Sequence, residues 1–439
     1  MPKLALHTQI FIALALAVFF GYLVNINTTD VSQPGLLGVS FISMFDYIGT
    51  IFLNALKMII VPLITSSIIV GVAGIGSSGN LGKLGGKTLL FYASTTLAAI
   101  LVGLVLVNAF APGIVDGEPA KDLLALDEDV GAIAERVEGR GAGDVAEIFL
   151  RMVPPNIIQA AANGQMLGII FFAILFGYFM TRLDNEFAEP LYKFWNGVFH
   201  VMMRMTEWIM MFAPIGVFGL VAKTVAETGF DAAGPLILFS FVVLLALAVH
   251  AFVTLPVLIR FVGNADPLKT IAGMSPAMLT AFSTASSSAT LPVTMDRLED
   301  KIGVSNETSS FVLPLGATVN MNGTALYECV AAMFIAQAYG LELTFGVQFS
   351  IVVIALLTSI GVAGVPSASL VAIAIILAAI GLPVEAIGVL LVFDRVLDMA
   401  RTSVNVWGDA VCATIVARLS GEKTNVGLDG DPSKETAGA

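Results

Sequence analysis

Five polar side chains share one face of an apolar segment near the C-terminal end of the chain. They are Asp394, Asp398, Arg401, Asn405 and Asp409. At about 100° per residue, this spacing keeps all five within a helical stripe roughly 80° wide. A charge at membrane depth costs at least ~2.5 kcal/mol, so such groups pair with each other or line a polar path. The stripe indicates a site for an anionic or zwitterionic solute together with cations, and internal ion pairs between helices are the alternative.

The composition is that of an all-α polytopic membrane protein. Hydrophobic residues make up 57% of the 439 residues and charged residues only 12%, against about 25% in soluble domains. The two cysteines lie in apolar segments and imply no disulfide framework, and the three scattered histidines lack metal-ligand spacing. The absence of a basic stripe disfavours nucleic-acid binding, and the absence of a phosphate-binding loop or a Ser–His pattern disfavours a pump or an enzyme.

Eight apolar segments fit full membrane spans. They are residues 8–25, 44–72, 87–111, 164–182, 196–222, 235–262, 308–338 and 385–418. Basic residues fall at alternate ends of successive spans, whereas the segment 113–148 holds ten acids against three bases. By the positive-inside rule, we expect both termini in the cytoplasm and the acidic loop outside. The polar tail 421–439 is predicted to be disordered.

Two further apolar segments are interrupted in the middle. Residues 266–302 are broken by Ser283–Pro292, and residues 346–383 by Gly361–Ser369. The alternation of the basic ends is kept only if each of these segments enters and leaves the membrane on the same side. Both are therefore predicted to be re-entrant helical hairpins. Non-helical backbone at membrane depth occurs where it lines a cavity, and interrupted segments mark the binding sites of transporters.

Polar residues inside these segments are the other candidates for chemistry. The serines 286–288 at the first hairpin tip suit an anion site, or else a small-residue packing motif. Asn320–Thr324 predicts an unwound turn whose carbonyls suit Na⁺, or else a kinked helix. Glu328 is a candidate proton carrier, unless it faces a base such as Arg395.

Three stretches of the sequence carry a resemblance to a known family. Residues 284–294, 313–337 and 394–409 resemble the glutamate/aspartate transporters, the dicarboxylate/amino acid:cation symporters, and most closely the animal excitatory amino-acid carriers and their bacterial relatives. The resemblance implies eight spans and two hairpins built as inverted repeats, in a homotrimer. It assigns residues 1–86 and 112–262 to a scaffold that includes the acidic loop. Residues 87–111 and 263–420 form a transport domain that slides across the membrane as an elevator, followed by the tail 421–439.

The resemblance also implies a site for an acidic amino acid. Arg401 resembles the residue that pairs with the side-chain carboxylate, for which a guanidinium fork is suited. Asp398 resembles the residue that takes the α-amino group. One methylene is worth only about 1–3 kcal/mol, so L-aspartate and L-glutamate both stay open. The resemblance adds these residues to the pocket: Ser287, Ser288, Thr324, Val365, Ser369, Thr402 and Asn405.

Three sodium sites follow from the same resemblance. The first consists of Gly316, Asn320, Asn405 and Asp409. The second consists of Thr318, Ser359, Ile360 and Val362. The third consists of Tyr92, Thr95, Thr96, Asn320 and Asn322. Glu328 matches the position of a coupled proton, K⁺ is a candidate for the return step, and no organic cofactor is implied.

The chain departs from the family pattern at three positions. Asn322 stands where the family usually has Asp, and the loss of a carboxylate weakens a cation site, so we expect fewer coupled Na⁺. Arg395 is expected to replace a displaced family arginine by pairing with Glu328 or Asp394. Ser369 replaces a usual Gly, which stiffens the second hairpin tip. A substrate-gated ion or anion channel, a C4-dicarboxylate symporter and a neutral amino-acid symporter remain alternatives, all in contact with lipid in the inner or plasma membrane.

Overall fold

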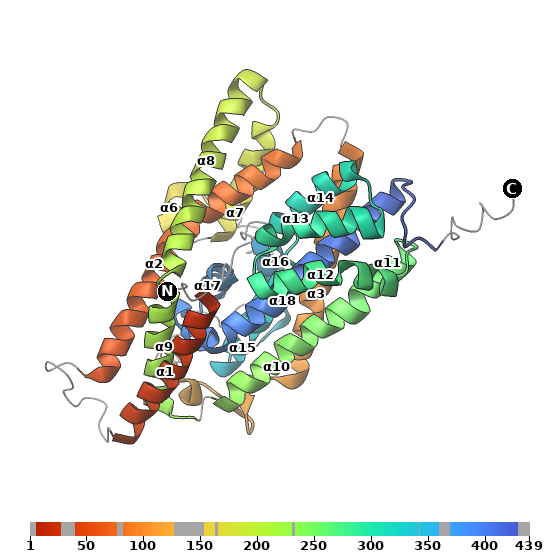
Figure 1. Ribbon diagram of the computed structural model, residues 1–439. Coiled ribbons are helices and arrows are strands. Elements are labelled where there is room, and N and C mark those ends of the chain that lie inside the picture. The colour runs from red at the N-terminus through yellow and green to blue at the C-terminus, as the bar shows by residue number, and fades with distance from the viewer. Residues whose placement is uncertain are drawn as a thin grey trace, which may run out of the picture.

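The protein is a bundle of long helices (Figure 1). The computed structural model describes residues 6–27, 40–76, 82–126, 153–162, 166–230, 233–341, 343–359 and 369–428. The first half contains α1 (Leu6–Asn27), α2 (Phe41–Gly76), α3 (Gly82–Phe110), β1 (Ile114–Val115), β2 (Glu118–Pro119), η3 (Asp122–Leu124), α6 (Ile157–Ala162), α7 (Met166–Met180), α8 (Asn185–Met210) and α9 (Ala213–Thr228). The short strands β1 and β2 pair in antiparallel fashion.

The second half contains the interrupted helices. They are α10 (Ala233–Val249), η4 (His250–Thr254), α11 (Leu255–Phe261), α12 (Pro267–Thr284), α13 (Ser287–Arg297), η5 (Leu298–Ile302), α14 (Asn306–Val319), α15 (Asn322–Ala338), α16 (Phe345–Ser359), α17 (Ser369–Ile380), η6 (Val384–Ala386) and α18 (Ile387–Leu419). The turns η4 and η5 are π-helical, and η3 and η6 are 3₁₀-helical.

The helices form two groups, which are visible side by side in Figure 1. In the first group, α9 packs against α1 and α2, and α2 also packs against α7 and α8. In the second group, α3, α10, α14 and α15 pack against α18, and α12 and α13 pack against each other. The groups meet mainly where α9 contacts α18. We call them the outer group (α1, α2, α6–α9) and the core group (α3, α10–α18).

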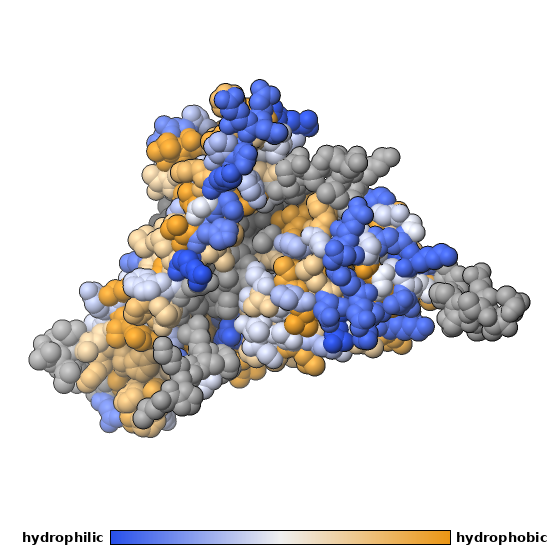
Figure 2. All heavy atoms as spheres, turned by 45° about the horizontal axis from the view of Figure 1, so that its top comes forward, coloured by the Kyte–Doolittle hydropathy of each residue, from blue (hydrophilic) through white to orange (hydrophobic). Residues whose placement is uncertain are grey.

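The apolar helices fit a polytopic membrane protein. Three helices in the described part are long and apolar enough to cross a membrane, namely Thr8–Asn27, Gly85–Phe110 and Ala233–Phe261. Large apolar side chains such as Phe19, Val105 and Phe252 are exposed along these helices, as expected where the surface faces lipid or another subunit. Figure 2 shows hydrophilic side chains gathered in patches at the periphery of this face, between areas of hydrophobic side chains.

Three expectations differ from the observed structure. The predicted span 196–222 is two helices, because the chain turns at Met211–Phe212 and Pro214 lies in the first turn of α9, where a missing N–H is tolerated. The segment 235–262, predicted to belong to the scaffold, packs against α3, α15 and α18. The predicted disordered tail includes residues 421–428, which are hydrogen-bonded to the core group.

Candidate functional site

The helices α14 and α15 are separated by a break at Asn320 and Met321. Both residues have non-helical backbone angles, with φ/ψ of −111°/68° and −98°/65°. The break is shorter than the predicted unwound turn Asn320–Thr324, because α15 already begins at Asn322. The break lies deep in the core group, and every residue of α15 is buried. Asn320 Nδ2 donates to Asp409 Oδ1 on α18 at 2.8 Å. The turn therefore presents backbone and side-chain oxygens inside the protein rather than at its surface.

The tip of the first hairpin is also a break between two helices. Ala285 ends α12 in the left-handed conformation at φ 51°, and Ser286 caps α13 by accepting a hydrogen bond from the Ala289 N–H at 3.2 Å. Ser287, the first residue of α13, is buried, whereas Ser288 is exposed. Of the serine run, only Ser287 is in place to face a buried site.

Arg401 is the centre of the polar stripe on α18. Its side chain is fully buried, and its Nη2 donates to Asp398 Oδ1 at 2.8 Å and to Asp394 Oδ1 at 3.1 Å. The guanidinium carbon lies 3.8 Å from the centre of the Tyr327 ring, whose hydroxyl donates to Asp394. A cation over an aromatic face is stabilised by the ring quadrupole. These contacts hold the guanidinium in one orientation.

Two nitrogens of Arg401 remain available. Nε and Nη1 are buried and have no hydrogen-bond partner among the described residues. An unsatisfied buried donor on a charged group is costly. Adjacent guanidinium nitrogens match the two oxygens of a carboxylate. The geometry therefore fits an anionic ligand group bound by the free side of the fork.

Arg395 pairs with a different residue from the two that the sequence analysis names. Its Nη1 lies 3.6 Å from Asp398 Oδ2, so the expected pairing with Glu328 or Asp394 is wrong. The two residues are one helical turn apart on α18, which brings their side chains together. Asp398 is thus flanked by two arginines, Arg395 and Arg401. Thr402, on the same face, donates to the Asp398 carbonyl oxygen at 2.8 Å.

Asn405 connects the stripe to α15. Its Oδ1 accepts from the backbone N–H groups of Gly323 at 2.8 Å and Thr324 at 3.3 Å, and its Nδ2 donates to Thr324 Oγ1 at 3.0 Å. Asn405 therefore binds the first turn of α15 within the predicted pocket. Asp409, one turn further on, accepts instead from Asn320 in the break between α14 and α15.

Glu328 is fully buried on α15 and forms no ion pair in the described part of the chain. Its Oε2 accepts from Thr358 Oγ1 on α16 at 3.0 Å, and its Oε1 has no hydrogen-bond partner among the described residues. A carboxyl in this position is able to bind a proton on the open oxygen. The alternative of a base-paired glutamate is not what the described residues show.

The predicted third cation site is assembled around the broken turn. Thr95 and Thr96 on α3 donate to Asn320 Oδ1 at 3.3 and 3.4 Å, and Thr96 also donates to Asn322 Oδ1 at 3.1 Å. Tyr92 donates to the Val312 carbonyl oxygen at 2.6 Å. All these side chains are buried. Hydroxyl and amide oxygens are ligands that suit a hard cation.

The predicted first cation site is partly assembled. A Cβ at Gly316 would lie 2.6 Å from Asp409 Oδ1 and 2.7 Å from Tyr92 Oη, so only a glycine allows this approach. Gly316, Asn320 and Asp409 are together, whereas Asn405 contacts α15. For the predicted second site, Ser359 is buried at the end of α16; Ile360 and Val362 lie outside the described residues, as does the side chain of Thr318.

The second hairpin is described only on its two sides. The helices α16 and α17 contact each other and both contact α15. Ser369, the first residue of α17, is buried, and its hydroxyl has no partner among the described residues. Val365 lies in the segment 360–368, outside the described residues.

Three residues of this region are not predicted from the sequence, namely Tyr327, Thr358 and His250. Tyr327 contacts Arg401, and Thr358 donates to Glu328. His250, on η4, accepts at Nε2 from Asn322 Nδ2 at 3.3 Å. His250 could have been singled out from the sequence, because an ionisable residue in the interior of an apolar span is a functional candidate. Tyr327 and Thr358 give no comparable signal, since their contacts depend on how separate helices pack.

Comparisons with known proteins identify the family of this chain. The family model described as "Sodium:dicarboxylate symporter family" matches residues 6–419. The chain belongs to this family. It is 36% identical over 427 residues to a proton/sodium-glutamate symport protein of Bacillus caldotenax, which covers 96% of each chain.

Two further relatives extend the comparison. The chain is 34% identical over 417 residues to a proton/glutamate-aspartate symporter of Escherichia coli (strain K12), covering 95% of this chain and 93% of the relative. It is 35% identical over 425 residues to excitatory amino acid transporter 3 of Mus musculus, covering 86% and 79%. The predicted resemblance to bacterial and animal carriers is thus confirmed.

Proposed function

We propose that this family member is a secondary symporter of acidic amino acids, L-aspartate or L-glutamate, driven by Na⁺. The observation that carries the proposal is the buried Arg401 guanidinium: its Nη2 is bound to Asp394 and Asp398, whereas Nε and Nη1 have no partner among the described residues. The open nitrogens would bind the side-chain carboxylate. Asp398, adjacent on the same helix face, would bind the α-amino group. An acidic amino acid satisfies both charges at once.

The buried oxygens support coupling to cations. The groups around Asn320, Asp409, Thr95 and Thr96 offer hydroxyl, amide and carboxylate oxygens, and the hydrogen bonds that join them in the described part of the chain involve no basic side chain. We expect Na⁺ to bind there and Glu328 to carry a proton, with K⁺ in the return step. Sodium and proton both occur in the name of the Bacillus caldotenax relative.

Topology and movement are part of the same proposal. The ends of several helices meet near the tail: Lys87 Nζ donates to the Leu419 carbonyl oxygen at 2.8 Å, Arg418 donates to Gly263, and Asn425 donates to Lys301. Basic residues of separate spans thus gather at one end, which supports a cytoplasmic tail. Eight spans with two hairpins, and an elevator-like movement of the core group against the outer group, complete the proposal.

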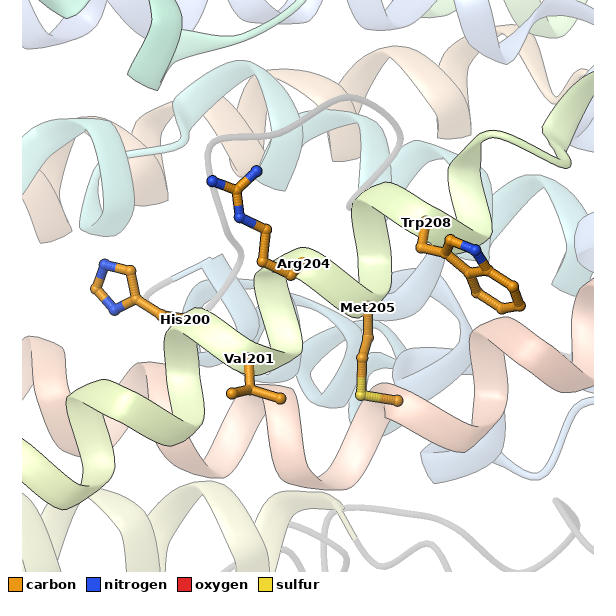
Figure 3. Close-up of a pocket in the computed structure, with 5 residues that line it drawn as sticks. All are labelled: His200, Val201, Arg204, Met205 and Trp208. Atoms are coloured by element: carbon orange, nitrogen blue, oxygen red, sulfur yellow. The ribbon is translucent and has the colours of Figure 1, made fainter.

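A homotrimer would form through the outer group. The helix α8 carries a shallow hollow lined by His200, Val201, Arg204, Met205 and Trp208 (Figure 3). Val201 and Trp208 are more than half exposed, which suits a face that contacts other subunits or lipid. This hollow lies on the outer group, and none of the polar residues of α18 lines it.

Radiolabelled L-aspartate uptake into proteoliposomes tests the proposed function. We expect uptake that requires an inward Na⁺ gradient at fixed pH. Uptake that is independent of Na⁺ but driven by a pH gradient would assign the coupling to a proton on Glu328 and contradict the proposed sodium sites. Substrate-gated current without matching substrate flux would instead favour a channel. No uptake under either gradient would show that Arg401 and Asp398 recognise another solute.

A further inference from the structure

His250 is a buried polar residue in an otherwise apolar stretch. It begins the π-helical turn His250–Thr254 in the middle of the candidate span Ala233–Phe261 and is fully buried. The turn is attached to α18, because Trp407 Nε1 donates to the Ala251 carbonyl oxygen at 2.9 Å. Single π-helical turns within α-helices frequently occur at functional sites, because the extra residue redirects a side chain.

The ring of His250 has one defined polar contact. Asn322 Nδ2 donates to its Nε2 at 3.3 Å, while Nδ1 is buried without a hydrogen-bond partner in the described part of the chain. The contact requires a lone pair on Nε2, so the ring is neutral with its proton on Nδ1. The amide nitrogen also lies against the backbone of Gly408, where a Cβ would be only 2.7 Å away.

This contact bears on which end of the Asn322 amide faces the other residues of the predicted third cation site, Thr96 and Asn320. An amide has donors at one end and an acceptor at the other. With the nitrogen bound by His250, Oδ1 turns to Thr96, which also reaches Asn320. Thr96 can donate to an oxygen or accept from a nitrogen, so it does not select the orientation by itself. A cation gains a ligand only if the oxygen end faces it.

We infer that His250 is a positioning residue for sodium binding. By accepting a hydrogen bond from Asn322, it holds the amide oxygen toward Thr96 and Asn320, so that a site without the usual carboxylate still binds a cation. The inference rests on the proposed sodium coupling and deepens it. An aspartate at position 322 would offer an acceptor oxygen in either orientation, because both of its carboxylate oxygens are acceptors. Here the pair His250–Asn322 would offer that oxygen instead.

The test is a double-mutant cycle on the purified full-length chain. The measured quantities are the Na⁺ concentration that gives half of the thermal stabilisation without substrate, and the Na⁺ dependence of L-aspartate binding. His250→Phe keeps most of the ring volume and removes the acceptor, whereas His250→Gln restores an acceptor near the Nε2 position. We expect His250→Phe to raise the half-saturating Na⁺ concentration about fivefold, the effect of one lost hydrogen bond, and His250→Gln to restore most of the loss.

Asn322→Asp provides the decisive comparison. With a carboxylate at position 322 there is no amide to orient, so His250→Phe should then leave the Na⁺ dependence unchanged, and Asn322→Asp alone should increase Na⁺ affinity or the Hill coefficient. A merely structural histidine would give equal losses in both backgrounds, which would overturn the inference. His200→Phe, on exposed α8, controls for loss of a histidine. If the unmodified protein shows no Na⁺ effect, the proposed function fails; a normal Na⁺ effect that His250→Phe leaves intact contradicts only the inference.

Discussion

At the residue scale, the chemistry of this protein depends on which donors and acceptors the fold leaves open. Two nitrogens of Arg401 have no partner in the part of the chain that the structure describes, although the side chain is surrounded by Asp394, Asp398 and Tyr327. The pairs with Asp394 and Asp398 use only Nη2, so internal pairing leaves Nε and Nη1 available to a ligand. In the proposed function, this open side selects the substrate.

Arg401→Cys should therefore change the substrate preference. We expect the variant to lose L-aspartate uptake by at least about a hundredfold, since a charge-assisted pair is worth ~3 kcal/mol or more, and to accept neutral amino acids such as L-serine. The measurement is competition of unlabelled amino acids against labelled uptake in proteoliposomes. Arg182→Cys, in the exposed turn that follows α7, is the charge-removal control. Unchanged aspartate affinity in Arg401→Cys would refute the assignment.

In the proposed function, Glu328 carries the coupled proton. If a neutral Glu328 accompanies the substrate, uptake should fall as external pH rises, because the proton-loaded fraction falls. Glu328→Gln fixes the neutral form and keeps the acceptor for Thr358. We expect an uptake rate that no longer varies with pH, measured with the Na⁺ gradient constant and compared with the exposed control Glu307→Gln. A pH profile identical to that of the unmodified protein would exclude Glu328 as the proton carrier.

Sequence patterns predict residues that lie on one helix better than residues that meet across helices. The stripe from Asp394 to Asp409 follows from helical spacing alone, and α18 is continuous through it. The pairing of Arg395 with Asp398, three positions apart on α18, also fits helical spacing. The contact between His250 and Asn322, in contrast, joins residues separated by 72 positions. Side-chain direction and helix packing decide such contacts, and the spacing of residues along the chain predicts neither.

At the scale of elements, the breaks in the helices position the site. The break at Ala285 and Ser286 turns the first hairpin and starts α13 with a capped N-terminus. Ala285 holds a left-handed conformation at φ 51°, which costs an alanine about 1 kcal/mol relative to glycine. Ala285→Gly should thus raise the free energy of unfolding or leave it unchanged, whereas the β-branched Ala285→Val should lower it by ~1 kcal/mol or more. Thermal unfolding in detergent, monitored without ligand, would show the opposite order if the turn were not left-handed.

Breaks with a polar signature were predictable, and those without one were not. Asn320-Met321 and the serine run stand out within apolar surroundings, because amides and hydroxyls are costly in a continuous membrane helix. The turn at Met211–Phe212 joins two apolar helices and only Pro214 marks it. The ordered residues 421–428 are polar and Gly-containing, yet Glu422 accepts from the backbone of Ser305 and from Thr308. Their order comes from capping the start of α14, a long-range contact.

At the scale of the whole molecule, packing within each group is tighter than packing between them. In the outer group, a Cβ at Gly21 or Gly219 would lie 2.7 Å from a backbone carbonyl oxygen of the neighbouring helix, so these helices touch backbone to backbone, as in other small-residue membrane contacts. At the contact between α9 and α18, a Cβ at Gly388 would lie 3.5 Å from Leu220, which is ordinary van der Waals separation. A cavity of about 340 Å³ adjoins this contact.

This difference is what an elevator requires, because one body must slide along the other without breaking up. Gly388→Ala should be tolerated, since the added methyl group meets only ordinary contact. Gly388→Phe places a ring between α18 and α9, so we expect L-aspartate binding within about twofold of the unmodified protein but uptake reduced by at least tenfold, roughly 1.4 kcal/mol in the barrier to movement. Binding is measured in detergent and uptake in proteoliposomes from the same preparation. Equal loss of both would indicate damage to the core group, and full uptake by Gly388→Phe would mean that α18 does not slide past α9 during transport.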